Sequence, residues 1–534
     1  MSKEKIHIFD TTLRDGAQTQ GVDFSLDDKI KISSALSSLG VNFIEGGWPG
    51  ANPTDTSFFD NPPKLNSELV AFGMTKRPGR SCENDPGISS IVNANVNTVC
   101  IVGKTWDFHV DVALGITNEE NLENIGESAK HFVKAKKEFM FDAEHFFDGY
   151  KNNRDYALSC IKSAYDSGAR WVVLCDTNGG TLPHEIGEIV GDVSKIIPND
   201  HIGIHAHNDT GNAVANSLNA VLAGARQIQG TLNGLGERCG NANLVSIIPS
   251  LILKKSLSDK FSLDINEEKL KSLTDCSRLL DEILNKTPNK HAPYVGASAF
   301  AHKGGLHVSA VQKDPKTYEH IEPEKVGNER AIVVSDQAGR SNILSKLERL
   351  NIKINKDDSK VQKILDEVKD REFIGYSYDG ADASFELLTR RLMGQVPDYL
   401  QITDYEVKII KQSKNKEINS LAKAHLLVDG EEIVCEGKGN GPVNALDQAI
   451  RSNLDRVGKY SEYLKDLRLV DYKVRILNTG TNATTRVSIE STDKNGKNWF
   501  TVGVSPNIIE ASFIALLDSI DYKLFKENAP SSTN

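Results

Sequence analysis

Short apolar runs recur along the first part of the chain at intervals of about 25 to 40 residues, and helical patterning fills the stretches between them. Eight such runs occur, at residues 6–10, 43–46, 69–73, 98–102, 138–142, 171–175, 202–206 and 227–232. Repeated strand–helix units leave this pattern, and eight of them close most economically into a parallel (β/α)8 TIM barrel. An open flavodoxin-like sheet is the alternative, but it would leave about two units unexplained.

Polar side chains gather directly at the ends of these runs. Arg14 and Asp15 follow the first run, Glu45 lies near the end of the second, and Glu144 and Thr177 follow the fifth and sixth. In α/β barrels the carboxyl ends of the strands carry the chemistry. The clustering therefore supports the barrel independently and predicts a functional site at that end.

The seventh run ends in the segment His205-Ala206-His207-Asn208-Asp209. Alternate residues of a strand point to the same face, so His205 and His207 are expected to lie side by side. Neutral imidazole is a common metal ligand, and Asp15 would add a carboxylate if the two strand ends meet. The other interpretation is a hydrogen-bonded core histidine, which burial habits favour for either residue alone. The alternation and the Asn-Asp continuation favour the metal site.

Composition and charge narrow the class of protein. The 534 residues are 39% hydrophobic and 25% charged, as in globular proteins, and the length suits about three or four domains. The net charge of -10 argues against nucleic acid as a partner. No run of about 18 apolar residues and no signal-peptide core occur, so we expect a cytoplasmic protein with no membrane partner. Seven cysteines without Cys-x-x-Cys spacing indicate reduced thiols.

The character of the chain changes after residue 285. A breaker-rich linker at 286–293 and a glycine-rich segment at 296–307 precede helical patterns at 343–350, 359–370 and 381–393, and a second seam follows at 394–398. We therefore expect a barrel domain at residues 1–285, a helical linker subdomain at 286–398 and an α+β C-terminal domain at 399–528.

The C-terminal domain contains a weak internal repeat. Strands are expected at 404–411, 420–428 and 431–437 before a helix at 443–454, and again at 471–477, 484–491 and 499–504 before a helix at 508–520. The segments before the two helices, 439–442 and 503–507, occupy similar places in each half. Free N–H groups at helix N-termini can hold an anion or an amino-acid carboxylate, although Pro and Gly equally well mark ordinary helix starts.

Four motifs carry a resemblance to a known family. DTTLRDG at 10–16, HAHND at 205–209, GLGERCGN at 234–241 and HKGGLH at 302–307 resemble the acyl-CoA Claisen-condensing synthases of the DRE-TIM metallolyase superfamily, the isopropylmalate and homocitrate synthase family. The C-terminal repeat resembles the leucine-type regulatory domain of isopropylmalate synthases. Within the family, the segments at 16–32 and 43–55 are most similar to the long-form citramalate synthases, which join pyruvate and acetyl-CoA.

The resemblance implies a metal centre with an arginine beside it. Asp15, His205 and His207 match the family's metal ligands, with Asn241 near or on the ion, and these donors suit Mn²⁺, Zn²⁺, Mg²⁺ or Co²⁺ alike. Arg14 matches the arginine that hydrogen-bonds the keto oxygen and stabilises the developing alkoxide. A bridge from Arg14 to Glu45 would be compatible with this role.

The remaining site residues are also implied by the resemblance. Glu45 would orient Arg14 or a metal-bound water, Glu144 would act in acid–base chemistry or substrate positioning, and His109 and Thr177 would bind substrate, Thr177 through the oxo-acid carboxylate. On sequence alone, Thr177 could equally belong to a helix cap. His307 would reach a partner subunit's active site, which implies a homodimer, and Tyr318 would lie near the CoA thioester. The proton-abstracting base is open between His307 and Glu144.

The implied reaction is a Claisen condensation of acetyl-CoA with pyruvate, followed by thioester hydrolysis to citramalate and CoA. Bulk from Trp48 and Trp106 near the mouth favours pyruvate, and isoleucine is the expected effector of the C-terminal domain. The alternatives are an isopropylmalate or homocitrate synthase, a lyase that cleaves a hydroxyacyl-CoA, and an inactive barrel that binds amino acids as a regulator.

Overall fold

The computed structural model describes residues 3–284, 286–332, 340–355, 358–378, 380–411, 418–428, 430–453, 460–477 and 483–532. They form two compact units, which are described separately: Met1–Phe300 with Ile321–Arg330, and Ala301–His320 with Ala331–Asn534. The expected domain boundaries at 285 and 398 stay predictions, and residue 285 lies outside the described residues.

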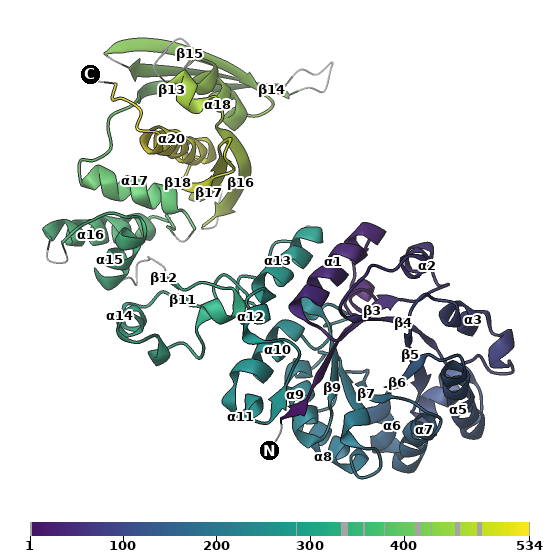
Figure 1. Cartoon of the computed structure of the whole chain (residues 1–534). Helices are drawn as coiled ribbons and strands as arrows, with labels where there is room; N and C mark the ends of the chain where they lie inside the picture. Colours follow the sequence, from purple (N-terminus) through teal and green to yellow (C-terminus); the bar gives the residue numbers. More distant parts are fainter. Residues whose placement is uncertain are drawn as a thin grey trace. The chain divides into compact units, whose positions relative to one another are not determined.

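The first unit contains a closed barrel of eight parallel strands, so the open-sheet alternative is wrong (Figure 1). Every predicted apolar run forms one strand: β2 His7–Asp10, β3 Phe43–Gly47, β4 Glu68–Met74, β5 Thr98–Lys104, β6 Glu138–Glu144, β7 Trp171–Asp176, β8 Ile202–Ala206 and β9 Gln227–Gly230. Parallel pairing follows chain order and closes between β2 and β9.

Helices separate these strands and surround the barrel (Figure 1). They are α1 Leu26–Leu39, α2 Pro53–Asp60, α3 Pro86–Val92, α4 Asp107–His109, α5 Asn118–Lys134, α6 Phe146–Asn152, α7 Arg154–Asp166, α8 Pro183–Val193, α9 Ala213–Ala223, α10 Leu244–Leu253, α11 Lys255–Ser258, α12 Glu267–Leu270 and α13 Leu273–Ile283. Local sequence sets their ends: Ser25 and Asp28 form a capping box at the start of α1, and Gly40 ends it at φ 102°.

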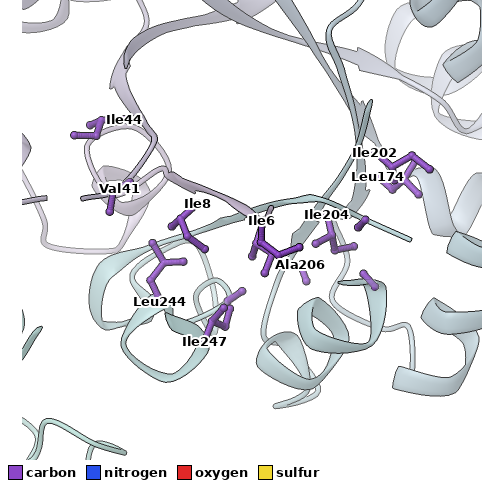
Figure 2. Close-up of a cluster of buried hydrophobic side chains, with 14 of the residues drawn as sticks. Ile6, Ile8, Val41, Ile44, Leu174, Ile202, Ile204, Ala206, Leu244 and Ile247 are labelled. Carbon is purple, nitrogen blue, oxygen red and sulfur yellow. The ribbon is translucent and has the colours of Figure 1, made fainter. Parts of the chain in front are cut away.

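Alternation along the strands divides the barrel core into two layers. Outward residues such as Ile8 and Ile204 pack against the helices, where Figure 2 shows them in one buried cluster with Leu244 and Ile247 of α10. Inward residues fill the barrel itself: Phe9, Val70, Cys100, Met140, Trp171, Val173 and Cys175. A series of side chains at every second position therefore leads from this interior toward the carboxyl ends of the strands.

The second unit begins with a helical segment. Its helices are α14 Gly305–Lys313, α15 Arg340–Arg349, α16 Ser359–Phe373 and α17 Asp382–Leu392, and the short strands β11 Ala301–His302 and β12 Ala331–Ile332 pair in parallel. Ile343, Ile364 and Phe385 belong to a core that α15, α16 and α17 share. The three helical patterns expected after residue 340 each form a helix.

The rest of the second unit confirms the expected α+β repeat. The first half comprises β13 Gln401–Lys411, β14 Ile418–Val428, β15 Glu431–Gly439 and α18 Pro442–Asn453, and the second comprises β16 Arg468–Ile476, β17 Thr485–Thr492, β18 Asn498–Ser505 and α20 Ile508–Lys526, with α19 Ser461–Leu464 between them. Each half forms a three-stranded antiparallel sheet. Residue 454, the expected end of the first helix, lies outside the described residues.

Among the residues that the structure describes, no helix is long and apolar enough to cross a membrane.

Candidate active site

A cavity of about 300 Å³ opens at the carboxyl end of the barrel strands. Its walls continue the inward series of each strand: Phe72 and Met74, Val102 and Lys104, Asp142 and Glu144, Cys175 and Thr177, and His205 and His207. The remaining lining comes from Arg14, Asp15, Gln18, Trp48 and Glu237. The inward-facing side chains are therefore apolar inside the barrel and mostly polar at the carboxyl ends of the strands.

Asp15, His205 and His207 converge at this cavity. The Nε2 atom of His205 lies 3.2 Å from Oδ2 of Asp15, Nε2 of His207 lies 3.7 Å from the same oxygen, and the two Nε2 atoms are 3.0 Å apart. All three side chains are buried, and a ligand atom from each lies within 4.8 Å of the others. One carboxylate oxygen and two imidazole nitrogens form a donor set that suits a divalent transition-metal ion.

A buried hydrogen-bond chain orients His205. Its Nδ1 donates to Oε1 of Gln229 at 2.8 Å, and Nε2 of Gln229 donates to Oδ1 of Asp142 at 2.9 Å. Because the amide oxygen can only accept, Nδ1 of His205 carries a proton, and in the neutral imidazole Nε2 is left with the lone pair that a cation needs. Ligand histidines are typically held through the other ring nitrogen in this way.

Asn241 and Arg238 flank the cluster. Nδ2 of Asn241 donates to Oδ2 of Asp15 at 2.7 Å, while its Oδ1 is buried and has no hydrogen-bond partner among the described residues. An orphaned buried acceptor costs about 1–3 kcal/mol, and a nearby cation would relieve it. Nη2 of Arg238 donates to Nδ1 of His207 at 2.9 Å. Cation binding through Nε2 of His207 therefore requires Arg238 to release Nδ1.

Electrostatics favour the ligand forms of two of the three groups. Burial opposes ionisation of Asp15, but Arg14 and the hydrogen bonds from His205 and His207 outweigh it and hold the pKa of this carboxyl well below its usual range. Burial lowers the pKa of His207. In His205 the hydrogen bond and charge of Asp15 outweigh burial and raise the pKa. At neutral pH, Asp15 is thus a carboxylate and His207 a neutral imidazole, as cation ligands must be.

Arg14 is held between a carboxylate and an aromatic ring. Its Nε donates to Oε2 of Glu45 at 2.7 Å, and its guanidinium lies 4.1 Å from the ring centroid of Phe72. Glu45 is completely buried, unlike most strand-end glutamates. Burial raises the pKa of Glu45 to about 7, Arg14 opposes the shift, and the charge of Asp142 adds to it. The expected bridge between Arg14 and Glu45 is therefore present in the structure.

Glu144 and Thr177 face the cavity, as the resemblance implies. Lys104 forms an ion pair with Oε2 of Glu144. Oγ1 of Thr177 accepts a hydrogen bond from the backbone N–H of His145 at 2.8 Å. Since this bond uses the oxygen of Thr177 as an acceptor, its hydroxyl hydrogen can be donated to a ligand.

Two residues expected at the mouth do not line the cavity. His109 packs against His145 with ring centroids 4.5 Å apart, and Trp106 packs against Phe108 at 5.0 Å. Both lie at or in α4, which begins immediately after β5 and turns these rings aside. Of the two tryptophans expected to supply bulk near the substrate, only Trp48 lines the cavity.

His307 and Tyr318 belong to the second compact unit. Their rings stack with centroids 4.0 Å apart and an interplanar angle of 22°. Both side chains are exposed. The structure brings the two residues together, and their part in the active site stays a prediction.

Three family models match successive parts of the chain. They are HMGL-like at residues 5–278, homocitrate synthase post-HMGL domain-like at 294–373 and LeuA allosteric (dimerisation) domain at 379–524. The (R)-citramalate synthase of Aquifex aeolicus is 52% identical over 529 residues, covering 98% of each chain. The (R)-citramalate synthase of Geobacter sulfurreducens is 47% identical, again over 98% of each chain. The chain belongs to the citramalate synthase family.

Synthases with another name match this chain with lower sequence identity. The probable 2-isopropylmalate synthase of Methanopyrus kandleri is 32% identical over 97% of this chain and 98% of its own length. The resemblance carried by the four motifs is thereby confirmed, and the C-terminal repeat is a LeuA allosteric (dimerisation) domain. HMGL-like enzymes depend on a divalent metal, and the Asp15, His205 and His207 cluster is a possible site for it.

Sequence reasoning gave no role to several residues that shape this citramalate synthase site. Lys104, Asp142 and Gln229 lie at inward positions of their strands, so the alternation contained a signal for each of them. Polar residues within otherwise apolar strands are rare and mark such positions. Arg238 has a positive φ of 55° in the glycine-rich turn, and no periodicity marks it.

Proposed function

We propose that this chain catalyses the condensation of acetyl-CoA with pyruvate, followed by hydrolysis of the thioester, to give citramalate and CoA. The observation that carries the proposal is the convergence of Asp15, His205 and His207 beside Arg14 in one cavity. Near full-length similarity to enzymes named (R)-citramalate synthase supports the choice of substrates.

The cavity offers complementary groups for each part of pyruvate. Asp15, His205 and His207, with Asn241, would hold a divalent cation such as Mn²⁺, Zn²⁺, Mg²⁺ or Co²⁺, which supplies Lewis-acid polarisation of the substrate carbonyl. The Thr177 hydroxyl would donate to the carboxylate. The guanidinium of Arg14, fixed by Glu45, would face the keto oxygen.

The proposed reaction needs a base near the acetyl methyl group and a positive charge near the keto oxygen of pyruvate. A base removes a proton from the acetyl methyl group, and the new carbanion forms a carbon–carbon bond with the keto carbon of pyruvate. Arg14 stabilises the alkoxide that develops on the former keto oxygen and that becomes the hydroxyl of citramalate. Water then cleaves the thioester and releases CoA as a thiol. Glu144, which lines the cavity, and His307 are the two candidates for the base.

The size of the cavity supports a small oxo acid. Aromatic and aliphatic side chains of Trp48, Phe72, Met74 and Val102 occupy one part of its lining. Such a wall would suit a short apolar substituent on the oxo acid. His109 is not part of the lining, but one of its ring nitrogens lies within 4.8 Å of a carboxylate oxygen of Glu144, which does line the cavity.

We propose a homodimer in which His307 and Tyr318 serve the active site of the partner subunit. The match to a dimerisation domain at residues 379–524 supports the dimer. The stacked pair is exposed within its own unit, as a group that acts on another subunit must be.

We also propose that isoleucine binds the C-terminal domain and inhibits the reaction. A cavity of about 780 Å³ lies between the two repeat halves and is lined by residues from both predicted helix starts, including Gly441 and Ile508. Arg468 and Asp447 supply charges of both signs, and Leu469 and Ile509 supply apolar contacts. This combination suits a zwitterion with an aliphatic side chain.

The decisive experiment is a thiol-release assay with acetyl-CoA and a panel of 2-oxo acids. We expect CoA release with pyruvate and little with 2-oxoisovalerate or 2-oxoglutarate. Preference for 2-oxoisovalerate would instead indicate an isopropylmalate synthase, and preference for 2-oxoglutarate a homocitrate synthase. Cleavage of a hydroxyacyl-CoA without condensation would indicate a lyase. Binding of amino acids without any turnover would indicate an inactive regulator.

A further inference from the structure

Two cavities of the barrel unit share one wall. The active-site cavity of about 300 Å³ and a second cavity of about 210 Å³ are both lined by Trp48 and Met74. No other residue lines both, among those that the structure describes. These two side chains therefore separate the second cavity from the substrate site.

The second cavity has an aliphatic floor. Ile88 and Ile91 of α3, each 1% exposed, contribute to it together with Leu114 and Pro78. Asn124 also lines it, and its buried Oδ1 has no hydrogen-bond partner among the described residues. A space lined in this way suits an alkyl chain better than a charged group.

Three charged residues line this cavity, and two of them, Lys76 and Asp85, already have partners within the protein, while Arg77 is exposed. Nζ of Lys76 donates to the carbonyl oxygen of Arg80 at 3.1 Å and lies 3.1 Å from Oε2 of Glu127. The Asp85 carboxylate accepts hydrogen bonds from the backbone N–H groups of Arg77 and Gly87. Neither side chain is therefore available to hold an anionic ligand without breaking these contacts.

Trp48 is the more rigid part of the wall. Its backbone N–H donates to Oδ2 of Asp55 at 2.8 Å, and its ring meets the ring of Phe72 edge-on, with centroids 5.6 Å apart and an angle of 83°. Phe72 in turn carries the guanidinium of Arg14 on its face. Met74 is 37% exposed and has an unbranched, adaptable side chain. The indole is thus the element that keeps the two cavities apart.

We propose that Trp48 is the specificity-determining residue that restricts the oxo acid to a methyl substituent, and that the second cavity can take a longer or branched aliphatic chain once the indole is removed. The inference rests on the proposed condensation with pyruvate and extends it to substrate selection. A difference of one or two carbons in an apolar pocket changes specificity about 10- to 200-fold, so a wall of this kind is sufficient.

The test compares Trp48→Leu with Trp106→Leu, because Trp106 lies beside α4 and lines neither cavity. The substrates are pyruvate, 2-oxobutanoate and 2-oxoisovalerate, each with acetyl-CoA, and the readout is kcat/KM from CoA release. In Trp48→Leu, we expect the ratio of kcat/KM for 2-oxoisovalerate to that for pyruvate to rise at least about tenfold. In Trp106→Leu, the ratio should stay within about twofold.

If Trp48→Leu does not fold, Trp48→Phe is the alternative. It keeps an aromatic ring against Phe72 and widens the passage between the two cavities less than leucine does. An unchanged ratio in a folded Trp48 variant that still condenses pyruvate would overturn the proposal, as would an equal change in Trp106→Leu. If the unaltered enzyme does not turn over pyruvate, the proposed function fails instead. In that case, calorimetry with the same oxo acids tests the role of Trp48. Tighter binding of 2-oxoisovalerate by the Trp48 variant than by the unaltered protein would support this role, and equal binding would contradict it.

Discussion

Lys29 and Asp55 form a buried ion pair at the point where the loop carrying Arg14 meets strand β3, which carries Glu45. Besides Oδ1 of Asp55, Nζ of Lys29 binds the carbonyl oxygen of Leu13 at 3.1 Å and that of Gly46 at 2.8 Å. One ammonium group thus joins the residue before Arg14 to the residue after Glu45. The placement of Arg14 thus depends on a helix, α1, that contributes no residue to the lining of the cavity.

Replacing Lys29 with methionine should therefore destabilise the barrel and lower activity. Loss of one partner of a buried pair leaves the other charge uncompensated and costs about 3–5 kcal/mol. We expect a lower midpoint of urea unfolding and, in the remaining folded protein, a reduced kcat because Arg14 and Glu45 are less well placed. Lys31→Met on the exposed face of the same helix is the control and should change neither quantity. Equal effects of the two substitutions would contradict this account.

Asp10 should make stability fall as the pH rises toward neutrality. Burial raises its pKa to about 7, although the hydrogen bonds from the N–H and hydroxyl of Thr12 oppose the shift. The unfolded chain releases this proton near pH 4, so between about pH 4 and 7 the native state binds more protons and loses stability with rising pH. Each pKa unit of difference corresponds to about 1.4 kcal/mol.

Asp10→Asn removes this titration and provides the measurement. Urea unfolding between pH 5 and 8 should show a smaller decline in stability for Asp10→Asn than for the unaltered protein. The same substitution at exposed Asp23 should leave the slope as it is. Parallel pH profiles for Asp10→Asn and the unaltered protein would show that Asp10 does not titrate in this range.

Gln229 should control metal affinity without touching the ion. Gln229 accepts a hydrogen bond from Nδ1 of His205 and donates one to Asp142. In Gln229→Leu these bonds are lost, and the His205 imidazole is no longer held in one orientation. Loss of such an outer hydrogen bond typically weakens metal binding 10- to 100-fold. Titration calorimetry with Mn²⁺ or Zn²⁺ should show this change, while Asp15→Asn should weaken binding much more. Unchanged affinity in both variants would place the metal elsewhere.

The positions of the strands along the chain and the shared facing of His205 and His207 could be predicted, because period-two alternation is a local property of the sequence. The contacts between side chains of different strands could not be predicted in this way. The pairing of Lys104 with Glu144 depends on which strands become neighbours and on their register, which are long-range properties. Trp106 was misplaced because a helix starts immediately after β5, and strand periodicity ends where the backbone turns.

Filling the cavity of the C-terminal domain should remove the response to isoleucine. Leu469 lines this cavity and is 39% exposed, so Leu469→Trp would occupy space that the effector needs. A point substitution is a sharper test than removing residues after about 400. Such a deletion would uncover α17, where Ser384 and Arg391 bind Asp518 of α20.

The matched control is Leu421→Trp, because Leu421 lies on the sheet of the first half, is 40% exposed and does not line this cavity. Both variants should keep the CoA-release activity of the unaltered enzyme, since neither residue lines the barrel cavity. Added isoleucine should inhibit the unaltered enzyme and Leu421→Trp but not Leu469→Trp. Full inhibition of Leu469→Trp would argue against an effector that packs on Leu469 beside the paired helix starts.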